Sequence, residues 1–153
     1  MTRTTRAVIS AVIVVAGLAL ALTPSRAADA ADPAVKAVHD DIQKTLGGVP
    51  AFVARVPKAA LPGAWQELKD LELSESTALP PKTKALISLA VAAQIPCQYC
   101  IWADTKTARQ LGASDEEIGE AVAMAGLTRN WSTIFNGLQV DFEQFKKDMG
   151  GGQ

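Results

Sequence analysis

Hydrophobic and polar residues alternate with a helical period along most of the chain. Apolar side chains recur at spacings of three and four, and no stretch alternates apolar and polar residues long enough to predict a strand. The clearest example is segment 79–96, in which one helical face carries Leu86, Leu89, Ala90 and Ala93. We therefore predict an all-α fold.

The first predicted helix has a start signal at one end and a glycine stop at the other. Asp32 fits an N-cap, Pro33 fits the first helical position, and Gly47 with Gly48 ends the helix. Three prolines then separate a short turn of helix, AFVARV, from the sequence GAWQELKDLEL. We interpret this proline-punctuated stretch as a lid or packing arm rather than a rigid rod.

Similar signals divide the rest of the chain. The prolines at 80–81 open a central helix, and Pro96 either ends it or marks the first turn of the next one, which should stop near Gly112. Ser114 and Glu117 fit a capping box at the start of another helix. The segments NWSTIFNG and LQVDFEQFKKDM follow, with aromatic and aliphatic residues again spaced by three and four.

Length and charge limit the classes of function. A chain of 153 residues has room for one ordinary domain with a single core. Its 15 Lys and Arg residues nearly balance its 16 Asp and Glu residues, so no strong field favours nucleic acid or an anionic membrane surface. We expect small molecules or other proteins as partners.

The N-terminus has the pattern of a secretory signal. Two arginines precede an uncharged run at 7–22, and small residues offer cleavage after Ala27 or Ala30. An uncleaved anchor is the alternative, but the run is shorter than the ~20 residues that a membrane span usually needs. We expect a periplasmic or extracellular protein with no membrane contact after cleavage. The expected organisation is a signal peptide at 1–27, an N-terminal helix at 28–48 and a helical domain at 49–150.

The two cysteines, Cys97 and Cys100, form a CxxC motif. If Pro96 sits in the first turn of a helix, the helix N-terminus stabilises a thiolate at Cys97 and lowers its pKa relative to a free thiol. Cys100 lies one turn further on the same face, where the two sulfurs can form a disulfide. A thiolate beside a resolving thiol is the arrangement that a dithiol redox catalyst needs.

Other uses of a CxxC motif fit less well. A structural zinc site needs four ligands, whereas the chain offers two cysteines and one distant histidine, His39. A c-type haem site requires histidine where Ile101 stands, and a thioredoxin-like enzyme would place the motif near a βαβ pattern. A purely structural disulfide remains open, although so short a loop gives little stabilisation through chain entropy. We expect no metal and no cofactor.

The central block, LPPKTKALISLAVAAQIPCQYCIWADTKTARQLGASDEEIGEAVAMAGL, resembles the carboxymuconolactone decarboxylase superfamily, specifically its AhpD-like alkylhydroperoxidase branch. The resemblance covers Leu79 to Leu127. It implies an all-helical fold, trimeric or hexameric assembly, and a thiol peroxidase that cycles its CxxC pair between dithiol and disulfide.

The proton relay of that branch is altered in this sequence. AhpD-like enzymes have a glutamate where Ala85 stands here and a histidine where Asp104 stands. Asp104 could replace the histidine if burial beside Trp102 and Tyr99 raises its pKa. The alternative is a solvated surface carboxylate. Ser88 could hold a water molecule where the glutamate would have reached.

The remaining aromatic and alanine-rich segments point to packing. Trp131 and Phe135 are predicted core residues, Met124 is predicted to pack on the alanine-rich face of its helix, and His39 is expected to be solvated. Helices with so few large side chains can pack closely on one another, and a fold this small commonly completes its core against a partner subunit. We therefore expect a homo-oligomer.

Two functions follow from these patterns. In the first, an exported thiol oxidoreductase reduces hydroperoxides or disulfides through Cys97, Cys100 and Asp104 and is re-reduced by a thiol donor. In the second, a non-enzymatic oligomer keeps a structural disulfide and acts as a binding protein. A lactone decarboxylase is a weaker third candidate, because a CxxC pair does not supply that chemistry.

Overall fold

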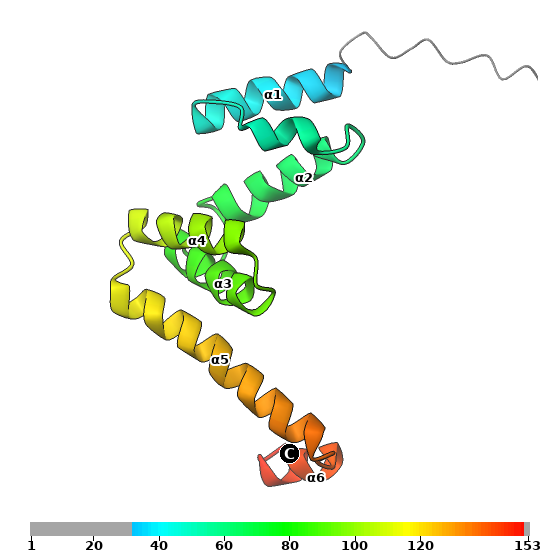
Figure 1. Cartoon of the computed structure of the whole chain (residues 1–153), viewed down its shortest axis with the longest axis vertical. Coiled ribbons are helices and arrows are strands. Elements are labelled where there is room, and N and C mark those ends of the chain that lie inside the picture. Colours follow the sequence, from blue (N-terminus) through cyan, green and yellow to red (C-terminus); the bar gives the residue numbers. More distant parts are fainter. Residues whose placement is uncertain (1–31, 152–153) are drawn as a thin grey trace, which may run out of the picture.

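The computed structural model describes residues 32–151, and every regular element within that range is a helix (Figure 1). The predicted all-α fold is confirmed. None of the helices in the described part of the chain is long and apolar enough to cross a membrane. The predicted signal peptide at 1–27 lies outside the described residues.

The first helix, α1 (Pro33–Leu46), begins and ends where the sequence signals predict. The side chain of Asp32 caps it by accepting a hydrogen bond from the amide of Ala34 at 2.9 Å. Gly47 ends it in the left-handed conformation, at φ 77°, which glycine adopts without steric cost.

The proline-punctuated stretch packs on α1 and forms a hydrophobic core with it. It contains the 3₁₀-helix η1 (Ala51–Arg55), the helix α2 (Leu61–Glu67) and the π-helical segment η2 (Leu68–Leu73). The buried members of this core are Val38, Ile42, Val53, Leu61 and Trp65. Of the two roles predicted for this stretch, the structure shows a packing arm.

Helices α3 (Pro81–Gln94) and α4 (Gln98–Gln110) pack against each other at the centre of the molecule (Figure 1). Three alanines, Ala85, Ala108 and Ala113, form the buried cluster between them, and such small side chains let the helices approach closely. The buried face of α3 runs through Ala85, Leu89 and Ala92. The predicted face of α3 is confirmed at Leu89, which is buried, and at Leu86, which packs against the alanine cluster. Its other two members, Ala90 and Ala93, are only partly buried, because α4 packs on the side that carries Ala85.

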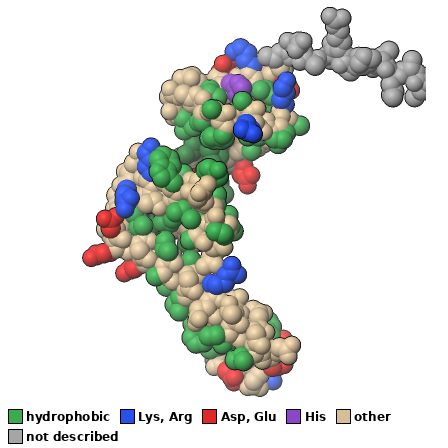
Figure 2. Space-filling model, viewed as in Figure 1, with side chains coloured by type: hydrophobic (Ala, Val, Ile, Leu, Met, Phe, Trp, Pro, Cys, Tyr) green, Lys and Arg blue, Asp and Glu red, His purple; other side chains and the backbone are tan. Residues whose placement is uncertain are grey.

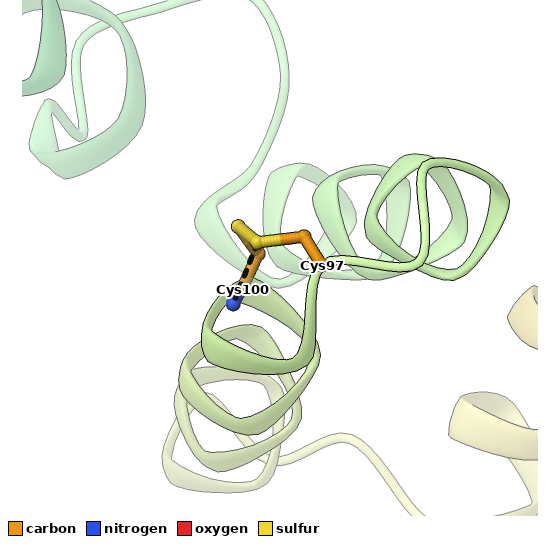
Figure 3. Close-up of a disulfide and its surroundings, with 2 residues drawn as sticks. All are labelled: Cys97 and Cys100. Atoms are coloured by element: carbon orange, nitrogen blue, oxygen red, sulfur yellow. Dashed lines mark hydrogen bonds between the residues drawn. A yellow bond between two sulfur atoms is a disulfide. The ribbon is translucent and has the colours of Figure 1, made fainter.

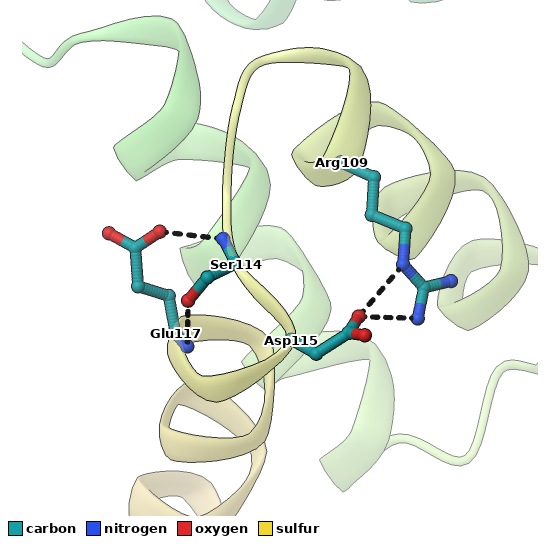
Figure 4. Close-up of polar contacts among 4 residues, drawn as sticks. All are labelled: Arg109, Ser114, Asp115 and Glu117. Atoms are coloured by element: carbon teal, nitrogen blue, oxygen red, sulfur yellow. Dashed lines mark hydrogen bonds and ion pairs between the residues drawn. The ribbon is translucent and has the colours of Figure 1, made fainter.

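Helix α5 (Asp115–Gly137) starts with the predicted capping box (Figure 4). The Ser114 hydroxyl accepts from the Glu117 amide at 3.1 Å, and the Glu117 carboxylate accepts from the Ser114 amide at 2.8 Å. Arg109, near the end of α4, pairs with Asp115 at 2.8 Å. These contacts fix the turn between α4 and α5, and the helix then continues without a break through the segment NWSTIFNG.

The second half of α5 extends away from α3 and α4 and ends against the short helix α6 (Phe142–Asp148) (Figure 1). Trp131 stacks on Phe135, which contacts Phe145 of α6 at a centroid distance of 5.1 Å. Trp131 nevertheless stays 49% exposed and Met124 58% exposed. Their predicted burial is wrong for the single chain, because α3 and α6 contact this part of α5 without covering these two side chains.

Hydrophobic side chains lie at the surface along the middle of the molecule and toward α6 (Figure 2). Among the large exposed ones on α3 and α5, or just after these helices, are Ile87, Val91, Ile95, Val122, Met124, Leu127, Trp131, Leu138 and Val140. A single chain therefore leaves much apolar surface in water.

Candidate redox site

The CxxC motif lies at the corner between α3 and α4 (Figure 3). Helix α4 begins at Gln98, and Cys97 is its N-cap. Pro96 therefore precedes the helix instead of occupying its first turn. The amide of Cys100 donates a hydrogen bond to the Cys97 sulfur at 3.2 Å. A helix N-terminus with free amide groups is the setting in which a thiolate is stabilised.

The two cysteines form a disulfide, with an S–S distance of 2.10 Å and a Cα–Cα distance of 5.3 Å. This Cα separation lies in the ordinary range for disulfides, so the backbone accommodates the bridge. Both cysteines are partly exposed. The pair is thus accessible to a reactant at the surface.

Cys100 opens onto a pocket of about 320 Å³ between η2, α3 and α4. Its polar lining consists of Glu72, Ser88, Cys100 and Asp104, and its apolar lining of Ile87, Val91, Ala92 and Ile95. The lining includes Cys100 and leaves out Cys97. The lining of this pocket thus combines one of the two cysteines with two acidic residues.

Asp104 lies one turn beyond Cys100 on α4 and is buried, with 9% of its surface exposed. Burial raises the pKa of its carboxyl above the ordinary value of 3.8, and the negative charge of Glu72 raises it further. The reading of Asp104 as a solvated surface carboxylate is therefore wrong. The expected burial of Asp104 beside Tyr99 and Trp102 is also wrong, because these two side chains are 78% and 68% exposed. The other walls of the pocket around Asp104 come from α3 and η2.

Glu72 is a site residue that sequence reasoning missed. It precedes Asp104 by more than thirty positions and lies in η2, so no local motif links the two. The segment that carries Glu72 is held near α4 by Lys84 on α3. The buried ammonium of Lys84 donates to the carbonyls of Leu71 and Ser74 and to the Thr77 hydroxyl at 2.5 to 2.8 Å. Because Leu71 and Ser74 lie on either side of Glu72 in the sequence, these bonds hold the backbone that carries Glu72 against α3.

The other residues considered from the sequence are placed differently. Ala85 is buried among the alanines of α3 and α4 and offers no polar atom to the pocket. Ser88, one turn after Lys84, does line it. His39 lies partly buried on α1, outside this pocket lining. Among residues 32–151, no group of three or more His, Cys, Asp or Glu side chains could hold a metal ion.

A family model describes more than half of the sequence and spans the whole of this site. The match runs over residues 59–141 and is to the carboxymuconolactone decarboxylase family. The chain belongs to this family. The matched range takes in α2 and all of α5, so it is wider than the central block on which the sequence resemblance rests.

Two similar proteins extend the comparison of this family member. The AhpD core of an alkylhydroperoxidase from Rhodospirillum rubrum matches with a TM-score of 0.63 and 33% identity, over 74% of this chain and 86% of that one. A protein from Paracoccus denitrificans, described as uncharacterized protein 4 in the cox locus, is 44% identical over 52 residues, or 34% of this chain. That match spans about half of the Paracoccus protein, 47% of its length.

Proposed function

We propose that this protein is a thiol-dependent oxidoreductase that reduces hydroperoxides through Cys97 and Cys100. The observation that carries the proposal is the pocket in which Cys100 lies beside a buried carboxyl group, Asp104. The similarity to an AhpD core supports the same chemistry.

In this proposal Cys100 is the attacking thiol, because Cys100 lines the pocket and Cys97 does not. Asp104 takes the thiol proton, and the thiolate attacks the terminal oxygen of R–O–O–H. The O–O bond breaks, the sulfur keeps the terminal OH as a sulfenic acid, and the departing RO⁻ takes the proton from Asp104 and leaves as ROH. The oxygen is reduced by two electrons, and Cys100 is oxidised by two.

Cys97 then resolves the sulfenic acid. Its sulfur attacks the Cys100 sulfur, the S–S bond forms, the S–O bond breaks, and hydroxide leaves with the Cys97 thiol proton as water. A thiol donor returns the disulfide to the dithiol by exchange, supplying two electrons and two protons. The disulfide in the structure corresponds to the oxidised state of this cycle.

Asp104 replaces the relay histidine of the AhpD-like branch in this scheme. A carboxyl group accepts a proton from a thiol less readily than imidazole does, and the burial that raises its pKa reduces this difference. The relay glutamate has no counterpart at Ala85, where the side chain is apolar and packed.

An organic hydroperoxide fits the surroundings better than hydrogen peroxide alone. A second pocket of about 410 Å³ adjoins the first and shares Glu72, Ile87 and Ser88 with it. Leu71 and Leu79 add apolar surface to its lining. This second pocket has the character needed to hold the alkyl part of a substrate whose peroxide end reaches Cys100.

The proposal includes export and assembly. The apolar run at 7–22 would direct the chain out of the cytoplasm. The disulfide cycle would then need a thiol donor that is present outside the cytoplasm. A second copy of the chain would cover the exposed apolar side chains of α3 and α5.

Stopped-flow mixing of the reduced protein with an organic hydroperoxide, followed by thiol loss, tests the activity. We expect oxidation much faster than that of a free thiol, no fast phase in Cys100→Ser, and a rate about 10²-fold lower in Asp104→Asn. Glu116→Gln, an exposed carboxyl outside the pocket lining, is the matched control and should behave as the unmodified protein.

Oxidation no faster than that of a free thiol, with no effect of Asp104→Asn, would overturn the proposal. In that case the disulfide-exchange activity of the pair would be measured next, and failure there would leave the bridge as a structural feature of a binding protein.

A further inference from the structure

The pocket beside Cys100 contains a second carboxyl group, Glu72, that the hydroperoxide mechanism above does not use. It comes from η2 and lines the same pocket as Asp104 of α4. Burial disfavours the ionised form of Asp104, and the negative charge of Glu72 adds to this effect.

The backbone around Glu72 is held in place by contacts on both sides of it. Segment η2 is a π-helical turn, a rare geometry that is frequent at functional sites, and it continues directly from α2. The carbonyls of Leu71 and Ser74, on either side of Glu72, both accept from the buried ammonium of Lys84. The backbone that carries Glu72 therefore keeps its place relative to α3.

We propose that Glu72 and Asp104 act as a carboxyl pair beside Cys100, in which the charge of Glu72 helps Asp104 to retain a proton. The proposal rests on the hydroperoxide-reducing function only for the use of that proton, and the existence of the pair is independent of it.

The groups facing Asp104 support this assignment of roles. From η2 the facing group is the Glu72 carboxyl, and from α4 it is Cys100. The part of α3 that lines the pocket, Ile87 to Ile95, contributes no titratable side chain. The ammonium of Lys84 is directed at the η2 carbonyls and the Thr77 hydroxyl. The ionisable neighbour that affects Asp104 is thus Glu72, and its charge raises the pKa of Asp104.

This arrangement has a chemical use in the first step of the cycle. The Glu72 charge strengthens Asp104 as a base for the Cys100 thiol, and the resulting carboxylic acid then donates the same proton to the leaving RO⁻. Because Cys100 lies in the first turn of α4, the helix N-terminus favours its thiolate and opposes the repulsion from Glu72. Glu72 acts through Asp104 and makes no bond to the substrate.

Carboxyl titration by ¹³C NMR on the full chain, in the reduced state, tests the pair without any substrate. We expect Asp104 to titrate above its ordinary value, and its midpoint to fall by about one pH unit in Glu72→Gln. Glu72→Asp keeps the charge and should keep the raised midpoint. Glu75→Gln, an exposed carboxyl three residues on and outside the pocket lining, should leave the midpoint unchanged.

An Asp104 midpoint that is the same in Glu72→Gln as in the unmodified chain would overturn the inference. The pH profile of thiol oxidation by an organic hydroperoxide is the second measurement, and in Glu72→Gln the limb that reports Asp104 should move in the same direction as the midpoint. If the unmodified protein reacts no faster than a free thiol while the midpoint still shifts, the proposed function fails and the carboxyl pair stands.

Discussion

Replacing Lys84 by methionine tests what holds η2 against α3. The Lys84 residue is 7% exposed, and its ammonium donates to Leu71 O at 2.7 Å, Ser74 O at 2.5 Å and Thr77 Oγ1 at 2.8 Å. Methionine keeps most of the apolar stem and removes the charge and all three hydrogen bonds. The change therefore isolates the polar contacts of one buried side chain.

The expected cost follows from opposing terms. A hydrogen bond to a charged group contributes about 1.5–3 kcal/mol, so three such bonds set an upper limit of roughly 4.5–9 kcal/mol. Burying an ammonium costs several kcal/mol, which methionine avoids. The freed acceptors lie near the surface, where Leu71 is 60% exposed, so water can replace part of what they lose. We expect a net loss of about 2–4 kcal/mol.

Urea unfolding measures this loss, with Lys82→Met as the matched control. Lys82 is two residues away on α3 and pairs with Glu117 at 2.8 Å, but both side chains are about 40% exposed. With a slope of about 2 kcal/mol/M, Lys84→Met should lower the unfolding midpoint by about 1–2 M, and Lys82→Met should cost less than about 1 kcal/mol. Equal effects of the two substitutions would refute the idea that Lys84 anchors η2.

Three further predictions concern other parts of the chain. The pKa of Asp41 is held below its ordinary value by hydrogen bonds from the Lys69 ammonium and the Trp65 indole. Its contribution to stability is therefore present above pH ~4 and is lost as the pH falls through the folded-state pKa. Asp41→Asn should lose less stability than the unmodified protein on acidification, and equal acid-unfolding curves would contradict this. Light scattering at micromolar concentration should give a mass well above the 16.1 kDa of one chain, with a shift toward the monomer in Trp131→Asp; a monomeric mass for the unmodified protein would exclude the expected assembly. Reducing the CxxC disulfide should lower the free energy of unfolding by no more than roughly 2 kcal/mol, because the closed loop holds only four residues. Urea titrations with and without reductant measure this difference, and a much larger drop would mean that the bridge is chiefly structural.

Local signals in the sequence were sufficient for the helices and their ends. The prolines at 80–81, the stop near Gly112 and the Ser114 capping box each act through backbone groups within a few residues, so their effect can be predicted without knowing the fold. The pairing of Cys97 with Cys100 is local for the same reason.

Contacts between distant segments could not be predicted in this way. The approach of Glu72 to Asp104 depends on a π-helical turn and on the buried ammonium of Lys84, neither of which leaves a periodic signal. Burial at Trp131 was predicted from its spacing, but the same spacing fits a face that packs within the chain and a face that packs on a second copy. A hydrophobic pattern indicates that a face needs a partner and does not identify it.

The order of the helices has a consequence for how the chain reaches this structure. Every pair of elements that packs extensively consists of neighbours or next neighbours along the sequence, such as α3 with α4 and α3 with α5. Little loop entropy has to be lost before such contacts form, and helical proteins of this kind fold in microseconds to milliseconds. Refolding should therefore show a fast first-order phase that is independent of protein concentration. A slower second-order phase should follow, in which folded copies meet and the fluorescence of the exposed Trp131 reports their association.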